Sequence, residues 1–218
     1  MTDSQPKPAL GRPRSTPSEI EATKQAILAA AATVYARSGD EPPVQEVLDA
    51  AKVSRATFYK YFPAKDALQK ALLDATVTLM LNAIQGAIDA ETTPVARVDA
   101  AIRTYLQWVA RSPALYRTLL TTALRPGSPT AEIRQKGIAR FAKQLASEVE
   151  RAGLPAADPL VYQALVLAAE GTAMRLVQTQ QPPEAAFVER ARKSLVRIIA
   201  ATLSQGGDDI PPLPRPQS

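Results

Sequence analysis

Proline is the residue whose distribution most constrains how this chain folds. The 218 residues contain 19 prolines, and most of them lie in clusters that leave long Pro-free blocks. A proline inside a helix costs about 3 kcal/mol, so these blocks predict helices that are interrupted at the clusters. The chain is therefore expected to be all-α, with helices over residues 18–38, 44–51, 55–62, 64–91, 95–111, 114–123, 130–152, 159–180 and 184–204.

The composition excludes several classes of chemistry. The chain has no cysteine and no histidine, which rules out disulfides, thiolate chemistry, most zinc sites and any Ser-His-Asp or Cys-His mechanism. No apolar run approaches the roughly 20 residues of a membrane span, and the polar N-terminus has no apolar signal core. We therefore expect a cytoplasmic protein with no catalytic residue, no metal, no cofactor and no membrane partner. The formal charge of +5 is compatible with a polyanionic partner but is common in other proteins too.

One short stretch, residues 54–65, sorts into two faces when it is placed on a helix. Phe58 and Phe62 lie four positions apart and form an inward stripe together with Thr57 and Tyr61. No acidic residue occurs in this stretch. A short helix with an apolar back and a basic front suits the major groove of DNA, which offers base-edge acceptors. The outward face holds Arg55, Ala56, Tyr59 and Lys60.

A helix-turn-helix is predicted around this stretch. A short helix over 44–51 is followed by a turn at Lys52 and then by the helix described above, which is the sequence form of that motif. Ser54 is expected to cap the second helix by accepting a hydrogen bond from the amide of Thr57. Pro63 is expected to end it.

The helix over 18–38 carries signals for both of its ends. Ser18 followed by Glu21 is expected to form a capping box at the start of this helix. Gly39 is expected to end it, because glycine readily takes the left-handed conformation past a helix C-terminus.

Residues 44–68 resemble the DNA-binding headpiece of the TetR family of bacterial transcription regulators. The resemblance rests on the pattern Val-Ser-x-x-Thr-aromatic-Tyr-x-Tyr-Phe-x-x-Lys-x-x-Leu and extends from residue 18 to about residue 75. It implies a three-helix headpiece joined by a long helix to a C-terminal helical domain that binds a ligand and dimerises. The chain departs from the family at two positions. Lys52 replaces the usual Gly, so a non-glycine residue is expected at positive φ, and Pro43 replaces the usual Thr.

The resemblance also implies which residues contact DNA. Lys65 matches a phosphate contact at the start of the next helix, where the helix dipole favours an anion. Phe58 and Phe62 are interpreted as core, and Thr57 and Tyr61 as at least half structural. The positions that approach bases or phosphates in the family correspond to Gln45, Arg55, Ala56, Thr57, Tyr59 and Lys60.

The N-terminal segment offers further cations. From residue 4 to residue 17 the chain has no acidic side chain and four prolines, so we expect a disordered basic arm whose Arg12 and Arg14 are candidates for the minor groove. The predicted organisation is an arm over 1–17, a DNA-binding domain over 18–66 with the helix-turn-helix at about 43–62, an effector-binding and dimerisation domain over 67–205, and a disordered Pro-rich tail over 206–218.

The last two predicted helices point to self-association. The helix over 159–180 has little polar surface, and its run from Ala168 to Ala173 is small enough for close helix approach. Two such helices from each of two chains would form a four-helix interface, which the resemblance also implies. The residues predicted to lie in this homodimer interface are Leu160, Ala164, Leu167, Gly171, Leu195 and Ile199.

The resemblance implies a small-molecule effector among the middle helices, and aromatic and polar side chains in apolar surroundings are the candidates for its pocket. The same residues would equally suit an ordinary core. The sequence does not identify the effector. The candidate pocket residues are Tyr105, Trp108, Tyr116, Gln163, Glu170, Met174 and Arg175.

Three functions from different classes remain open at this point. The leading hypothesis is a sequence-specific DNA-binding regulator, a homodimeric repressor that an effector releases from a palindromic operator on double-stranded DNA. The alternative is an effector-independent architectural protein that binds DNA by charge and shape. An enzyme on a helical scaffold has the least support, because Glu170 is the only carboxylate found in an apolar setting.

Overall fold

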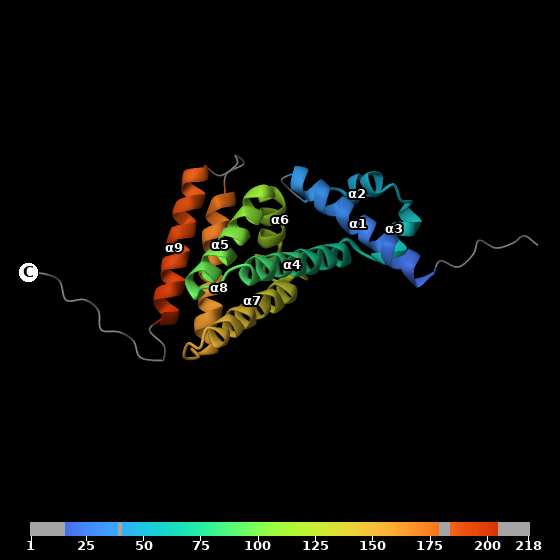
Figure 1. Ribbon diagram of the computed structural model, residues 1–218. Coiled ribbons are helices and arrows are strands. Elements are labelled where there is room, and N and C mark those ends of the chain that lie inside the picture. The colour runs from blue at the N-terminus through green and yellow to red at the C-terminus, as the bar shows by residue number, and fades with distance from the viewer. Residues whose placement is uncertain (1–15, 39–40, 179–183, 205–218) are drawn as a thin grey trace, which may run out of the picture.

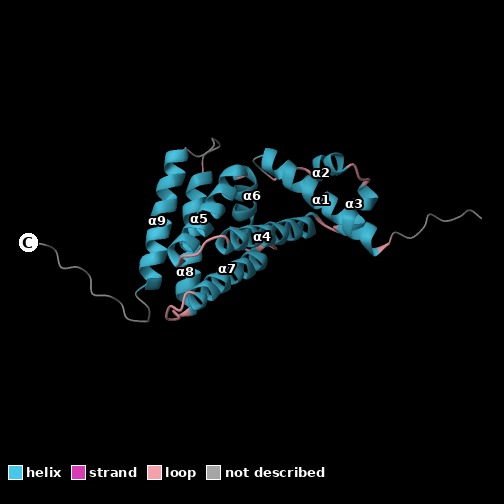
Figure 2. Cartoon of the chain, viewed as in Figure 1, coloured by secondary structure: helices cyan, strands magenta, loops and turns pink. Residues whose placement is uncertain are grey.

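The computed structural model describes residues 16–38, 41–178 and 184–204, and all of its regular structure in these ranges is helical (Figures 1 and 2). The prediction of an all-α chain is confirmed, and each predicted helix is present within a few residues of its expected bounds. The helices are α1 (Pro17–Ser38), α2 (Val44–Ala51), α3 (Arg55–Tyr61), α4 (Lys65–Asp89), α5 (Pro94–Arg111), α6 (Pro113–Leu124), α7 (Ala131–Arg151), α8 (Pro159–Val177) and α9 (Ala185–Ser204).

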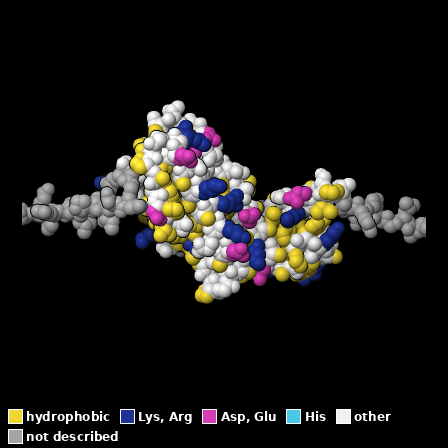
Figure 3. All heavy atoms as spheres, turned by 90° about the horizontal axis from the view of Figure 1, so that it is seen from below, with side chains coloured by type: hydrophobic (Ala, Val, Ile, Leu, Met, Phe, Trp, Pro, Cys, Tyr) yellow, Lys and Arg dark blue, Asp and Glu magenta, His cyan; other side chains and the backbone are white. Residues whose placement is uncertain are grey.

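The helices form two lobes of unequal size. The smaller lobe consists of α1, α2 and α3, and α4 runs out of it into the larger lobe formed by α5 to α9 (Figure 1). With 25 residues at 1.5 Å per residue, α4 is about 37 Å long, which is enough to connect the two lobes directly. Seen from below, the lobes meet at a narrower waist where Lys and Arg side chains lie among Asp and Glu side chains (Figure 3).

The prolines mark helix starts rather than gaps between helices. α1, α5, α6 and α8 each begin with a proline, namely Pro17, Pro94, Pro113 and Pro159. A proline at the first helical position loses no hydrogen bond, because the amide there has no intrahelical partner, and its fixed φ already suits a helix. α1, α5 and α6 therefore begin one residue earlier than expected, and α8 begins at Pro159 as expected.

The start of α1 differs from the expected one. The capping box is formed by Thr16 and Glu19, not by Ser18 and Glu21. The amide of Glu19 donates to Thr16 Oγ1 at 3.3 Å, and the amide of Thr16 donates to the Glu19 carboxylate at 2.8 Å. The same spacing occurs two residues earlier in the chain, and there Pro17 occupies the favoured first position.

One hydrophobic core extends from the small lobe into the large one. Phe58 and Phe62 are fully buried in a cluster that also contains Leu72 of α4 and Leu115 and Leu119 of α6. α1 packs against α6 as well as against α2. The predicted boundary between residues 66 and 67 therefore lies within the first turn of α4 and does not separate two cores.

Two helices, α4 and α8, are long and apolar enough to cross a membrane when only length and composition are considered. This corrects the expectation that no segment approaches such a length. In this fold α4 packs against α5 and α7, and α8 packs against α5, α6, α7 and α9. The finding is weak evidence for a membrane, because core helices of soluble proteins meet the same criterion.

Candidate DNA-binding surface and internal cavity

α3 presents the two faces that its sequence predicts. Phe58 and Phe62 point into the core, Phe58 lies against the Tyr59 ring with centroids 5.3 Å apart, and Thr57 is half-buried. Ser54 Oγ accepts from the amide of Thr57 at 3.1 Å, as expected for the cap. The side chains on the solvent face, all exposed, are Arg55, Ala56, Tyr59 and Lys60.

The turn before α3 is built around a left-handed lysine. Lys52 has φ 54° and ψ 40°, as the replacement of glycine predicts. Its amide donates to the carbonyl of Asp49 at 3.3 Å, and the amide of Val53 donates to the carbonyl of Leu48 at 3.2 Å. These are the two hydrogen bonds of a Schellman ending, so the helix-turn-helix keeps its geometry without the glycine. Pro43 precedes α2 and provides no side-chain cap.

A chain of hydrogen bonds joins α2 to α3 on the exposed surface. Arg55 Nη2 donates to Gln45 Oε1 at 2.7 Å, and Gln45 Nε2 donates to Asp49 Oδ1 at 2.8 Å. Gln45 and Arg55, both predicted to approach DNA, are thus adjacent in the folded chain. Asp49 was not singled out in the sequence, because its role depends on the crossing of the two helices.

Lys65 is held by an acidic residue at the junction of the two lobes. Its Nζ lies 3.0 Å from Glu41 Oε1, and Arg125, just past α6, approaches the other oxygen of Glu41 at 3.5 Å. Gln69 of α4 donates a further short hydrogen bond to Glu41. Partial burial acts to raise the pKa of Glu41, but hydrogen bonds from Lys65 and Arg125 outweigh it and hold this pKa below its ordinary value. No pattern along the chain pointed to Glu41, a loop residue between α1 and α2.

The predicted arm residues Arg12 and Arg14 lie outside the described residues, as does Gly39. The predicted tail over 206–218 also lies outside them.

The large lobe contains a partly open cavity of about 370 Å³. It is bounded by α4 on one side and by parts of α5, α6, α7, α8 and α9 on the others. Apolar side chains make up most of its wall. Those that α4 contributes are spaced on one helical face: Leu73, Val77, Met80, Ile84 and Ile88.

Four polar side chains from four helices meet at the cavity wall. The hydroxyls of Tyr105 (α5) and Tyr116 (α6) lie 2.7 Å apart. Arg134 (α7) makes a two-pronged ion pair with Glu170 (α8), one contact being Nε to Oε2 at 3.1 Å. Burial raises the pKa of both tyrosines, and the nearby Glu170 raises it further. Both phenols therefore stay protonated at neutral pH.

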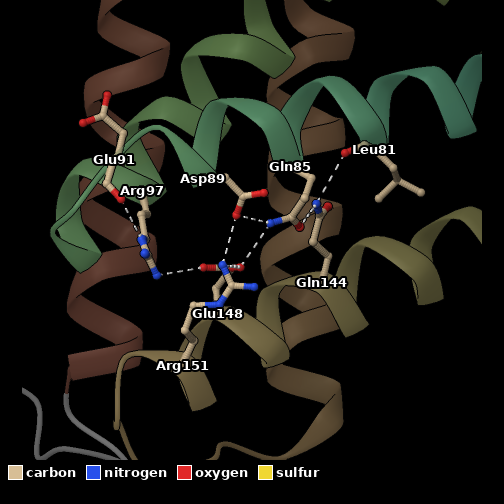
Figure 4. A network of polar contacts seen from close by, with 8 residues as sticks. All are labelled: Leu81, Gln85, Asp89, Glu91, Arg97, Gln144, Glu148 and Arg151. Carbon is tan, nitrogen blue, oxygen red and sulfur yellow. Dashed lines mark hydrogen bonds and ion pairs between the residues drawn. The ribbon is translucent and has the colours of Figure 1, made fainter.

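A second ion pair lies on the wall towards the far end of α4. Arg97 Nη1 of α5 lies 3.5 Å from Glu148 Oε2 of α7, and Gln85 of α4 donates to the other Glu148 oxygen at 3.5 Å. Gln144 of α7 donates to Gln85 at 2.8 Å. Figure 4 shows these side chains bridging α4, α5 and α7, with Asp89 on the same network.

The cavity corrects the expected set of pocket residues. Tyr105, Tyr116 and Glu170 line it. Gln163 and Arg175 are exposed on α8 instead. The wall of α8 is formed by positions 165, 166, 169 and 170, and Arg175 is turned about 140° around the helix from Glu170. The two remaining candidates, which pack within the core and are absent from the wall, are Trp108 and Met174.

α8 and α9 leave an apolar face uncovered. On α8 the four predicted interface positions are all exposed, and Leu160 exposes 70% of its surface. On α9 both predicted positions, Leu195 and Ile199, are buried within the protomer, whereas Ile198 is 48% exposed. The uncovered positions of α8 are Leu160, Ala164, Leu167 and Gly171.

The helix-turn-helix part of the chain matches a family of known proteins. Residues 27–72, which span most of α1 and all of the helix-turn-helix, match the family model described as bacterial regulatory proteins of the tetR family. The regulator EthR of Mycolicibacterium smegmatis is 27% identical over 188 residues, which cover 83% of this chain and 86% of EthR. The chain carries the helix-turn-helix domain of the TetR family.

Solved structures of TetR-family proteins share the fold. A regulator from Streptomyces coelicolor superposes with a TM-score of 0.66 and 19% identity, covering 84% of this chain and 97% of the other. AibR, solved with isovaleryl coenzyme A and operator DNA, superposes with a TM-score of 0.56 and 19% identity, covering 81% and 97%. These likenesses show the fold, and the helix-turn-helix that the family model matches is the DNA-binding motif of bacterial regulatory proteins of the tetR family.

Proposed function

We propose that this protein is a homodimeric repressor that a small molecule releases from a palindromic operator. One observation carries the proposal. Four side chains belong both to the core that holds α3 and to the wall of the cavity, so an occupant of the cavity would touch the residues that position the reading helix. These four side chains are Leu73 and Val77 of α4 and Leu119 and Ala123 of α6.

The exposed face of α3 is proposed to enter the major groove. Arg55 stands at the N-terminal end of the helix, the end that meets base edges in helix-turn-helix proteins. Its guanidinium can pair with both acceptors of a guanine. Gln45 holds Arg55 from α2, and Lys65 is proposed to contact a phosphate. The further contacts proposed for this surface are Ala56, Thr57, Tyr59 and Lys60, with Arg12 and Arg14 of the arm.

The uncovered face of α8, continued by Ile198 of α9, is proposed as the dimer interface. Leu160 and Leu167 are large apolar side chains that water contacts in the isolated protomer. Ala164 and Gly171 lie between them and allow two helices to approach closely. A two-fold axis through this interface relates the two copies of α3 in the dimer. A dimer of that symmetry binds a palindrome.

The cavity is proposed as the effector site, and AibR supports this, because that related fold was solved with both a small molecule and operator DNA. Binding in the cavity can release DNA only if the occupant prefers a different arrangement of α4 and α6. Leu73 and Leu119 are the contacts through which such a preference reaches α3. A regulator that acts on DNA in this way is proposed to work in the cytoplasm.

The test of this function is a selection of bound duplexes from a random pool, followed by titration at two salt concentrations. The proposal expects a motif with two-fold symmetry and a protein stoichiometry of dimers on each site. Binding without any preferred motif would favour the alternative, an architectural protein, because non-specific binding rests on phosphate contacts alone.

A further inference from the structure

The cavity is elongated along α4. Its wall includes Leu73 near the small lobe and Ile88 at the other end of the helix. The two residues are fifteen positions apart, which corresponds to about 22 Å at the rise of an α-helix. The wall at this other end also includes Leu154, which follows α7, and Leu203, in the last turn of α9. A volume of about 370 Å³ drawn out over this length suits an extended chain better than a compact ring system.

The charges on the wall cancel in pairs. The wall contains two cations and two carboxylates, Arg97 with Glu148 and Arg134 with Glu170, and just outside the wall Arg151 pairs with Glu148 at 3.2 Å and with Asp89 at 3.1 Å. Each pair is mostly withdrawn from water, so a ligand carboxylate could reach Arg134 only by displacing Glu170. That exchange would leave a buried carboxylate without a partner beside a second anion, which is strongly unfavourable. A ligand ammonium could reach Glu170 only by displacing Arg134, which would leave a buried guanidinium without its carboxylate.

The tyrosine pair keeps one hydrogen-bond donor. Each phenol has one O–H, and the contact between Tyr105 and Tyr116 uses one of the two. The second O–H has no acceptor among the described residues, although both side chains line the cavity. An oxygen acceptor on the ligand would satisfy it. The buried phenols remain donors at neutral pH because burial raises their pKa.

From these three observations we infer that the cavity takes a long, uncharged, chain-like molecule with one oxygen acceptor near its middle or head, such as an ester or a ketone of a fatty chain. The inference deepens the effector role proposed above and rests on it. It names the chemical class of the ligand: the apolar stripe of α4 binds the chain, Tyr105 and Tyr116 bind the oxygen, and the paired charges exclude ionic head groups.

The experiment compares three probes that share a ten-carbon chain and differ in the head group: methyl decanoate, decanoate and decylammonium. Trp108 is the only tryptophan of the chain and packs against the core that holds α3 and against Met80, Ile84 and Ile88 of the cavity wall, so its fluorescence reports binding without DNA. We expect methyl decanoate to bind at least tenfold more tightly than either charged probe. Equal or tighter binding of decanoate or decylammonium, or no binding of methyl decanoate, would overturn the inference.

A pair of variants tests the role of the tyrosines. The double variant Tyr105→Phe/Tyr116→Phe removes both hydroxyls from the cavity and should weaken methyl decanoate about fivefold, whereas a single change would leave one phenol free to donate to the ligand. Tyr162→Phe, its control, removes the hydroxyl of a buried tyrosine that accepts from the amide of Ala157 and is absent from the cavity wall. This control should leave the affinity for methyl decanoate unchanged. An equal loss in both variants would contradict the assignment of the oxygen acceptor to the tyrosine pair.

A second readout separates the two proposals. The same probe is titrated against the complex with the selected duplex. Release of DNA by methyl decanoate supports both the ligand class and the effector role. Binding by Trp108 fluorescence without release of DNA would contradict the effector role and leave the ligand class standing.

Discussion

Lys65 Nζ lies 3.0 Å from a carboxylate oxygen of Glu41, and Arg125 from the other lobe shares the same carboxylate. Lys65 is the residue proposed to contact a DNA phosphate. In the free protein its ammonium is therefore already paired, and a phosphate must compete with Glu41 for it. The same carboxylate links the small lobe to the end of α6, so the pairing of Lys65 and the position of α6 are coupled.

The first prediction concerns this competition. Glu41→Gln should tighten binding to all duplexes, because Lys65 becomes free to neutralise a phosphate. The slope of log affinity against log salt should steepen by up to about 0.9, the value for one added phosphate contact. Asp66→Asn is the matched control, since it also removes one negative charge, next to Lys65 in sequence and exposed. Equal effects of both variants would show that net charge, and not the release of Lys65, is responsible.

The second prediction follows from the lowered pKa of Glu41. Because this pKa lies below the ordinary value of 4.5, its ion pairs stabilise the fold fully above about pH 4.5 and lose their effect as the pH falls through the folded-state pKa. Glu41 and Lys65 each expose about a third of their side chains, so the contribution should be only about 0.2–1 kcal/mol.

Thermal unfolding of the parent chain and of Glu41→Gln measures this contribution. The parent should be the more stable of the two at neutral pH, and the difference should shrink towards zero in acid. A difference that stays constant from neutral pH down to about pH 3 would contradict the assignment of the effect to ionised Glu41.

The third prediction separates reading of bases from binding of phosphates. Arg55→Ala should cost about 1–3 kcal/mol on the selected site and relax the preference at one position in each half-site. Lys65→Ala should weaken all sequences about equally and leave the preferred motif intact. Gln45→Ala should act in the direction of Arg55→Ala but more weakly, because Gln45 orients the guanidinium. The measurement repeats the selection from random duplexes for each variant. A changed motif for Lys65→Ala together with an unchanged motif for Arg55→Ala would show that the two roles are reversed.

The fourth prediction tests the uncovered face of α8. A Cβ at Gly171 would meet no atom within 4 Å in the protomer, so Gly171→Leu should fold normally. Across a close helix interface the larger side chain should weaken the dimer by about 1–3 kcal/mol through overpacking. Sedimentation velocity over a range of concentrations measures the dimer constant. Gly86→Leu on α4 is the control, since it is also a helical glycine with open space around it. An unchanged dimer constant for Gly171→Leu would place the interface elsewhere.

Local features of the fold could be predicted from the sequence. The clusters of proline define where helices begin, because a proline acts on its own residue and the one before it. The two faces of α3 follow from the spacing of Phe58 and Phe62. The left-handed turn at Lys52 follows from its place in a recognisable motif. Each of these depends on residues within one or two helical turns, so the pattern along the chain contains the information.

The tertiary structure decided which face of each apolar helix is covered. Leu195, Ile198 and Ile199 are all apolar, and only the packing of α9 against α5 and α8 shows that Ile198 is the exposed one. In the same way, the periodicity of α8 did not show that Glu170 lies on the cavity side of the helix and Arg175 on the exposed side. An apolar residue can be buried by its own chain or by a partner, and its sequence neighbours are the same in both cases.

The tertiary structure also decided the pairing of charges. Glu41 and Arg125 are 84 positions apart, and Arg134 and Glu170 are 36 apart. No local pattern selects one partner among 26 Lys and Arg residues and 21 Asp and Glu residues. Charged side chains are long and flexible, so which of them meet depends on how the helices that carry them cross. The helix proposed to read DNA was therefore evident from sequence, whereas the ion pairs that connect the small lobe to the large one and neutralise the cavity were determined by helix packing.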